Sequence, residues 1–258
     1  MRSERTAAGW QLTETTGPAA ALHDRAIPPD PVPEVWIHHV EGPALVLGST
    51  QDDRDLVVTD AGETASSAST ASSAVSSAIE VCRRRSGGGL VSLLPGNDLW
   101  IDVILPSSSG LSVDDVGLAG AWVGQTWAAA LREALPAAVD GEPWPVEVHR
   151  GSLRHRAAGR VLCFAGLGPG EVTVGGRKVV GLSQRRTRHA ARFQSVMTWS
   201  WPGEWLAPQL TDQALERGGL TIAGVRSMPV GLPDEILEST RPSLATVTQA
   251  FLDRLPTP

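Results

Sequence analysis

Three consecutive glycines follow three arginines and a serine in segment 82–91, which reads CRRRSGGGLV and lies between two apolar stretches. Glycines destabilise a strand or helix unless another group must approach the backbone closely. The backbone N–H groups of Gly87, Gly88 and Gly89 can point at an anion. The arginines of 83–85 supply fixed positive charge beside them. The spacing matches neither a Walker loop nor a dinucleotide-binding loop. The segment therefore predicts either an anion site or an exposed arginine-rich turn.

A lysine at the start of a strand-like segment is the second candidate. Lys178 follows the Gly-Gly pair at 175–176, and the alternation of its segment can point it inward toward a cleft. A lysine amine beside a phosphate or carbonyl stabilises developing negative charge. The alternative is a solvated hairpin lysine, but Gly181 weakens it, since a glycine in a strand often marks the close approach of a ligand. With the arginines of 185–192, this segment again indicates a local anion site.

A cysteine is the third candidate. Cys163 lies in the apolar run 161–165, for which we expect a strand, and a buried cysteine is usually inert packing. The functional alternative is a thiolate nucleophile activated by Lys178 or the nearby arginines. Cys82 precedes the arginines and is expected to be structural.

Composition limits the classes of function. The chain has 258 residues, of which 41% are hydrophobic, and a net charge of -6, enough for one large domain or two small ones. The acidic balance argues against nucleic-acid binding, and no apolar run is long enough to span a bilayer. Two cysteines do not form a secreted disulfide framework, and the first residues lack a secretory signal. We therefore expect a cytoplasmic protein.

The remaining pattern predicts the elements that position these residues. We expect an N-terminal arm over 1–33, then one domain over 34–258 with an Ala/Ser-rich insert near 61–77 and a C-terminal helical tail. The predicted strands are 35–40, 43–51, 98–106, 146–149, 160–164, 171–174, 177–183 and 193–199, and the predicted helices are 112–135, 212–217 and 243–255. This order predicts an α+β fold built on a mixed or antiparallel sheet.

The motifs together resemble the catalytic domains of lipoate-protein and biotin-protein ligases. Segment 84–97 (RRSGGGLVSLLPGN) is similar to the glycine loop of that family, and segment 176–184 (GRKVVGLSQ) is similar to its lysine motif. Segment 45–51 (LVLGSTQ) is similar to a further turn. The resemblance covers about residues 35–200. It implies an α+β fold of mixed, largely antiparallel sheets packed with helices.

The resemblance also implies an activity. Such ligases activate lipoate or octanoate with ATP and Mg²⁺ and pass the acyl group to a lysine of a lipoyl carrier domain. The carrier is the E2 subunit of a 2-oxoacid dehydrogenase or the H protein of glycine cleavage. By resemblance, Lys178 would contact the carboxyl group and α-phosphate of the acyl-adenylate. The other implied binding residues are Arg84, Ser86, Gly87, Gly88, Gly89, Asn97, Gly181 and Ser183, with Asn97 on the nucleotide side.

Departures from the motifs leave other readings open. The His-Asp pair of the ligase loop is replaced here by Leu93-Leu94, and a histidine after the lysine motif by Gln194-Ser195. Little chain after about residue 210 remains for the accessory domain of many ATP-using ligases. The Cys163-Phe164 pair ahead of Lys178 resembles the cysteine-dependent octanoyltransferases. That branch uses no ATP: it takes octanoyl from an acyl carrier protein as a thioester on the cysteine. We rank the ligase first, the transferase second and a non-catalytic acyl-binding relative third.

Overall fold

The computed structural model describes residues 2–57, 79–138, 140–238 and 242–258. The predicted Ala/Ser-rich insert near 61–77 lies outside these residues. Where the structure describes the chain, no helix is long and apolar enough to cross a membrane.

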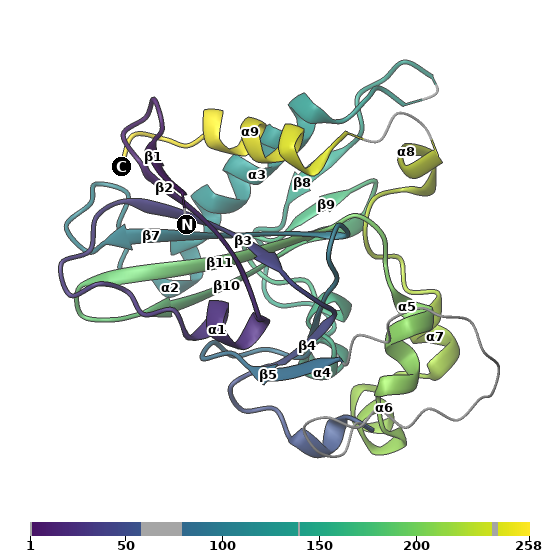
Figure 1. Ribbon diagram of the computed structural model, residues 1–258. Coiled ribbons are helices and arrows are strands. Elements are labelled where there is room, and N and C mark those ends of the chain that lie inside the picture. The colour runs from purple at the N-terminus through teal and green to yellow at the C-terminus, as the bar shows by residue number, and fades with distance from the viewer. Residues whose placement is uncertain (1, 58–78, 139, 239–241) are drawn as a thin grey trace.

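A large, twisted sheet forms the centre of the molecule (Figure 1). Its strand order is β1-β2-β3-β7-β11-β10-β9-β8. These strands are β1 (Arg2–Arg5), β2 (Gln11–Gly17), β3 (Glu34–Val40), β7 (Asp98–Pro106), β8 (Val146–Val148), β9 (Val172–Val174), β10 (Arg177–Arg186) and β11 (Ala190–Thr198). The pair β2–β3 is parallel, and the other neighbours are antiparallel. The predicted mixed, largely antiparallel α+β fold is therefore confirmed.

A small second sheet carries the glycine loop. Its strands β4 (Ala44–Leu47), β5 (Glu80–Arg83) and β6 (Val91–Leu93) lie in the order β5-β4-β6. Strand β4 runs parallel to β5 and antiparallel to β6. The glycine loop connects β5 to β6, so both of its ends are hydrogen-bonded to the same central strand.

Helices cover the sheets on both sides (Figure 1). Helix α3 (Ala121–Ala134) packs with α9 (Leu244–Asp253) on the large sheet, and the rings of Trp127 and Phe251 lie 4.7 Å apart there. Large buried aromatic side chains contribute much of the hydrophobic stabilisation of such a core. The other helices are α1 (Ala19–Asp24), α2 (Val116–Ala119), α4 (Arg156–Val161), α5 (Gly203–Leu206), α6 (Asp212–Gly218), α7 (Ile222–Arg226) and α8 (Asp234–Glu238), with short 3₁₀ turns at Asp53–Asp55, Cys163–Ala165 and Ala207–Gln209.

The hairpin around the predicted lysine strand is confirmed. Strands β9 and β10 pair antiparallel, and the turn between them is Gly175-Gly176. These glycines have φ angles of 55° and 78°. Both angles lie in the left-handed region, which only glycine adopts without a steric penalty and which two-residue hairpin turns require.

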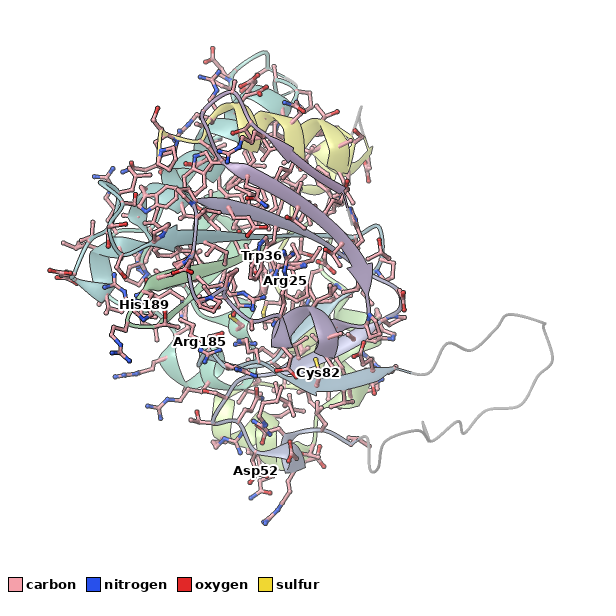
Figure 2. The ribbon with its side chains drawn as sticks, turned by 60° about the vertical axis from the view of Figure 1, so that its left-hand side comes forward. Arg25, Trp36, Asp52, Cys82, Arg185 and His189 are labelled. Atoms are coloured by element: carbon pink, nitrogen blue, oxygen red, sulfur yellow. The ribbon has the colours of Figure 1, made fainter. Side chains whose placement is uncertain are left out.

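Residues 2–24, which we expected to be part of an N-terminal arm, instead form strands β1 and β2 and helix α1 of the folded domain. Strand β2 pairs in parallel with β3, with Leu12 opposite Val35. The segment from Trp10 onward has apolar residues at Trp10 and Leu12, two positions apart, and is rich in threonine, a pattern that fits a half-buried strand. Trp10 and Leu12 join the core beneath α3 and α9. Helix α1 follows and lies beside the small sheet, as Figure 2 shows from another side.

Two predicted elements near the site also differ. The run expected as a strand over 160–164 is instead the end of α4 followed by the turn Cys163–Ala165. A short apolar run cannot be assigned by periodicity alone, because both a buried strand and a buried helix bury every position. The helix predicted over 112–135 is broken at Gly120 into α2 and α3. Asp115 caps α2 by accepting a hydrogen bond from the Gly117 N–H at 2.7 Å.

Candidate functional site

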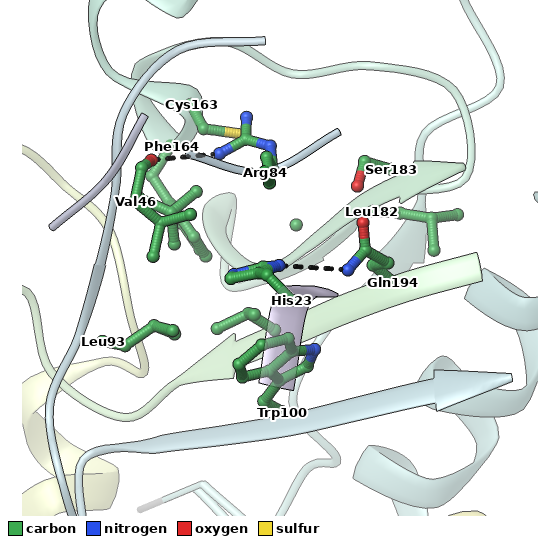
Figure 3. Close-up of a pocket in the computed structure, with 13 residues that line it drawn as sticks. His23, Val46, Arg84, Leu93, Trp100, Cys163, Phe164, Leu182, Ser183 and Gln194 are labelled. Carbon is green, nitrogen blue, oxygen red and sulfur yellow. Dashed lines mark hydrogen bonds between the residues drawn. The ribbon is translucent and has the colours of Figure 1, made fainter. Parts of the chain in front are cut away.

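A narrow, mostly apolar pocket opens between the small sheet and the large one (Figure 3). Its empty volume is about 420 Å³, part of which is open to solvent. Seven of its lining side chains are apolar: Val46, Val91, Leu93, Trp100, Phe164, Leu182 and Val196. The polar and small residues of the wall are His23, Arg84, Cys163, Gly181, Ser183 and Gln194. An apolar cleft with a few convergent polar groups is the usual form of a small-molecule site.

Cys163 lies in the wall of this pocket, at the turn that follows α4. Its N–H donates to the carbonyl oxygen of Leu90 at 2.9 Å, which ties the turn to the end of the glycine loop. The side chain is partly buried and forms no disulfide. Of the two predicted readings of this residue, the position in a pocket wall fits the nucleophile better than inert packing.

Arg84 holds the glycine loop together from inside. Its guanidinium donates to the carbonyl oxygens of Gly87 at 2.9 Å and Gly89 at 2.7 Å, and to that of Val46 at 3.2 Å. The side chain is buried, and desolvation lowers its pKa, while Cys163 acts in the opposite direction. Arg84 and Cys163 thus line the same pocket, although most donors of the guanidinium are already used by the loop.

Two of the three loop glycines are required: Gly88 by its backbone angle and a neighbouring side chain, and Gly89 by the close approach of other backbone. Gly88 has a φ angle of 101°, and a Cβ there would lie 2.8 Å from Nη2 of Arg84 and 4.0 Å from Sγ of Cys163. A Cβ on Gly89 would lie 2.7 Å from the carbonyl oxygen of Gly159, and the Gly89 N–H donates to that oxygen at 3.1 Å. The Gly89 N–H therefore binds α4, which corrects the expectation that all three loop N–H groups face an anion.

Lys178 lies behind the pocket wall. Its Nζ donates to the carbonyl oxygens of Cys163 at 2.9 Å and Gly166 at 2.8 Å. It also pairs with Oε2 of Glu171 at 2.7 Å, and both of these side chains are more than nine-tenths buried. The ammonium group thus fixes both ends of the turn that carries Cys163. Lys178 does point inward, as predicted, but toward protein acceptors.

A chain of polar side chains forms one wall of the pocket. The hydroxyl groups of Ser86 and Ser183 are 3.1 Å apart, and Ser86 donates to Oε1 of Gln194 at 3.2 Å. Nε2 of Gln194 lies 3.3 Å from Nδ1 of His23 (Figure 3). The predicted residues Ser86 and Ser183 are therefore joined to two residues that the sequence did not single out.

A buried ionic network fixes helix α1 against the large sheet. Nε of Arg192 donates to Oδ2 of Asp102 at 2.7 Å, while Nε1 of Trp100 donates to Oδ1 at 2.7 Å. Burial alone would raise the pKa of Asp102, but the charge of Arg192 and the hydrogen bonds from His38 and Arg192 hold it below its usual range. Nearby, Arg25 lies over the ring of Trp36, 3.8 Å from its centroid (Figure 2).

Asn97 is placed away from the pocket. Its Nδ2 donates to Oγ1 of Thr198 and to the carbonyl oxygen of Ser200, both at 3.0 Å, and its Oδ1 accepts from the Ser200 hydroxyl at 2.8 Å. It joins the start of β7 to the end of β11. Burial raises the pKa of the adjacent Asp98 to about 7. In this structure Asn97 connects strands and does not line the pocket.

The structure thus brings together part of the predicted set. Arg84, Cys163, Gly181 and Ser183 line the pocket, Ser86 borders it, and Gly87, Gly88, Gly89 and Lys178 support its wall. Sequence reasoning missed His23, Trp100, Glu171 and Gln194. Glu171 lies close before the Gly-Gly turn of Lys178, and this spacing was the one available signal.

Two further observations concern the second cysteine and the possible metal ligands. Burial, together with the charges of Glu80 and Asp24, raises the pKa of the Cys82 thiol to about 12, which fits the structural role expected for it. Over the described ranges, no three side chains of His, Cys, Asp or Glu gather as metal ligands.

Comparison with solved structures identifies the fold. A T. acidophilum protein solved with bound lipoic acid matches with a TM-score of 0.59 and 14% identity, over 94% of this chain and 83% of that one. A bipartite lipoate protein ligase, solved with its E2 lipoyl domain from Thermoplasma acidophilum, gives 0.58 and 15%, over 94% and 80%. P. falciparum LipL1 in complex with lipoate gives 0.53 and 9%, over 94% and 60%.

Comparison with curated protein sequences finds no match. A family profile does match: the lipoyl protein ligase A/B catalytic domain aligns with residues 21–255, which include the second half of α1, the glycine loop, Cys163 and Lys178. The chain therefore belongs to the lipoyl protein ligase A/B catalytic-domain family.

Proposed function

We propose that this protein transfers an octanoyl or lipoyl group to the lysine of a lipoyl carrier domain, and that the acyl chain lies in the pocket beside Cys163. The apolar side chains that line the pocket suit a hydrocarbon chain, because the burial of each CH₂ group contributes about 0.8 kcal/mol to binding. Relatives of the same fold are described with lipoate or lipoic acid and with an E2 lipoyl domain. The carrier is an E2 subunit of a 2-oxoacid dehydrogenase or a glycine-cleavage H protein.

The observation that carries this proposal is the thiol of Cys163 in the pocket wall, beside the charge of Arg84. A neighbouring cation stabilises a thiolate, which is the nucleophilic form of cysteine. We propose that this thiolate attacks the carbonyl carbon of an octanoyl thioester on an acyl carrier protein. A new C–S bond forms, and the thiolate of the carrier leaves and takes up a proton.

The second half-reaction completes the transfer. The lysine amine of the lipoyl carrier domain attacks the carbonyl carbon of the Cys163 thioester and loses a proton. The amide bond forms as the Cys163 sulfur leaves as a thiolate, ready for the next cycle. Lys178 supports this chemistry indirectly, because its bonds to the carbonyl oxygens of Cys163 and Gly166 hold the turn in place. On this route no nucleotide or metal cofactor is required.

An ATP-dependent ligase is the second candidate, and the serine-glycine loop together with the lysine motif favours it. Bound ATP with Mg²⁺ would supply the adenylate group that activates the carboxylic acid. Lys178 and Arg84 fit this group poorly: Lys178 is bound to Glu171 and two carbonyl oxygens, and Arg84 to three carbonyl oxygens. A phosphate would have to displace these acceptors, so we derive no step through the nucleotide.

Transfer assays with and without ATP distinguish the candidates. We expect octanoyl transfer from octanoyl-acyl carrier protein to an isolated lipoyl domain in the absence of ATP, and its loss in Cys163→Ser. ATP–pyrophosphate exchange with lipoate or octanoate, unchanged in Cys163→Ser, would instead identify a ligase. Neither reaction, with octanoate still raising the melting temperature, would identify a non-catalytic acyl-binding protein and contradict the proposal.

A further inference from the structure

His23 is a buried histidine that faces the pocket from helix α1. It is 8% exposed, and its ring lies 4.2 Å from the ring of Trp100, with a tilt of 33° between the planes. Figure 3 shows it above Trp100, with its other side open to the space between Arg84 and Gln194. Neither the lysine nor the cysteine chemistry described above uses it.

The hydrogen bonds of the polar wall fix which nitrogen of His23 carries the proton. Oε1 of Gln194 accepts from Ser86, so its amide Nε2 is the group that faces Nδ1 of His23, at 3.3 Å. Nδ1 is then the acceptor, and the proton of the neutral ring is on Nε2. In the part of the chain that the structure describes, no residue accepts a hydrogen bond from this Nε2–H.

The ring is neutral at physiological pH. Burial, assisted by the charges of Arg192, Arg84 and His38, lowers the pKa of His23 to about 3, although Asp102 acts in the opposite direction. A neutral imidazole is a hydrogen-bond donor that needs no counter-ion, and it can polarise a carbonyl group. The pocket therefore contains a donor without an acceptor, in a wall that is mostly apolar.

The backbone around His23 is held as firmly as its ring. Arg192 donates from Nη1 to the carbonyl oxygens of His23 at 3.0 Å and Arg25 at 2.9 Å, and from Nη2 to that of Leu22 at 3.0 Å. Asp102 fixes this arginine in turn. A donor held in place before the reaction stabilises developing charge without a cost of reorganisation.

We propose that Nε2–H of His23 donates a hydrogen bond to the carbonyl oxygen of the acyl group on Cys163 and stabilises the negative charge that develops there. Both residues line the same pocket, and Arg84 is close enough to each to interact with it electrostatically. A thioester carbonyl is the acceptor that this donor lacks. The inference rests on the proposed thioester chemistry, and it assigns to α1 a catalytic residue.

The infrared spectrum of the acyl-enzyme tests this contact directly. Octanoyl labelled with ¹³C at the carbonyl is loaded onto Cys163 from its carrier protein, and the carbonyl stretch is recorded. A hydrogen bond weakens the C=O bond, so we expect a lower frequency in the wild-type protein than in His23→Phe. His23→Gln retains an N–H donor and should restore part of the shift. His39→Phe, which removes an exposed histidine of β3 outside the pocket, is the matched control and should leave the frequency unchanged.

The rate of transfer gives the second readout. We expect His23→Phe to slow octanoyl transfer by about 10²-fold, the effect of removing one donor from an oxyanion site, while its acyl-enzyme still forms. If His23→Phe does not fold, His23→Met replaces it. Equal carbonyl frequencies and rates in the wild type and these variants would overturn the inference while leaving the Cys163 thioester established. Failure of the wild type to form any acyl-enzyme would overturn the proposed function, and the role of His23 with it.

Discussion

Lys178 and Glu171 form a buried ion pair at 2.7 Å behind the pocket wall. Glu171 also accepts hydrogen bonds from the N–H groups of Gly168 at 2.6 Å and Leu182 at 3.2 Å. Removing one partner of a buried pair leaves an uncompensated charge, which typically costs about 3–5 kcal/mol. The Lys178–Glu171 pair therefore contributes to the stability of the fold as well as to the site.

We predict that Lys178→Met lowers the free energy of unfolding by about 3 kcal/mol or more. The double variant Lys178→Met with Glu171→Gln should be less destabilised than the single variant, because it removes the unpaired carboxylate. Denaturant titration of the three proteins measures both differences. A single variant as stable as the wild type would show that the pair does not hold the turn.

His23 should also affect the dependence of stability on pH. Its pKa is about 3 in the folded protein, and a histidine in an unfolded chain has a pKa near 6.5. Between these pH values His23 is protonated in the unfolded chain but not in the folded protein. Its contribution to the free energy of unfolding is therefore fully present above pH 6.5 and is lost as the pH is lowered toward 3. We predict that the free energy of unfolding falls less steeply in His23→Gln, by up to about 1.4 kcal/mol per pH unit. Parallel pH curves for the two proteins would contradict this.

At the scale of single residues, the sequence predicted the motif residues better than their contacts. The glycines, Cys163 and Lys178 were found because their types and spacing are unusual. The hydrogen bonds of Arg84 to three carbonyl oxygens were not predictable, since they depend on where the chain folds back. His23 has no motif around it, and only the packing of α1 brings it to the pocket.

At the scale of elements, the close approach of β4 to the glycine loop positions the pocket wall. A Cβ added to Gly48, just after β4, would lie 1.8 Å from the carbonyl oxygen of Gly88. We predict that Gly48→Ala lowers the free energy of unfolding by about 1–3 kcal/mol, the range of an overpacked core. It should also reduce acyl transfer, because the part of the loop beside Cys163 must shift.

Gly42→Ala is the matched control, since a Cβ at Gly42 would meet nothing within 4 Å. Thermal unfolding and transfer rates of both variants measure the difference. Equal losses in the two variants, or none in Gly48→Ala, would contradict the role given to the close approach.

Most strands and long helices were predicted because alternation and 3.6-residue periodicity are local signals. The Gly-Gly hairpin before Lys178 and the strand Asp98–Pro106 are examples. The end of α4 and the turn after it were mistaken for a strand, because the apolar run 161–165 is too short to show a helical periodicity. Strand β2 was missed because its partner β3 lies beyond a proline-rich connection, and such pairing is a tertiary feature.

At the scale of the whole molecule, a basic segment leads to the site in a chain of net charge -6. Segment 149–162 (HRGSLRHRAAGRVL) contains no acidic residue, and its four arginines are exposed: Arg150, Arg154, Arg156 and Arg160. Within the described chain, none of them forms an ion pair with a carboxylate. Because α4 runs directly into the turn of Cys163, an acidic acyl carrier protein docked there would bring its thioester to the pocket.

We predict that Arg160→Glu raises KM for octanoyl-acyl carrier protein by about threefold to tenfold, since charge complementarity mainly assists encounter. The increase should shrink at high salt and should be absent with a small uncharged octanoyl thioester as donor. Arg188→Glu, an exposed charge reversal at the turn between β10 and β11, is the control. An equal rise in KM in both variants would argue against docking on α4.

The central claim is that Cys163 carries the acyl group, and the mass of the intact protein tests it most directly. The protein is incubated with octanoyl-acyl carrier protein in the absence of ATP, and its mass is recorded before the lipoyl domain is added. We predict a gain of one octanoyl group in the wild type, none in Cys163→Ser, and loss of the gain when the lipoyl domain is added. An unmodified wild-type protein, or the same gain in Cys163→Ser, would contradict the account.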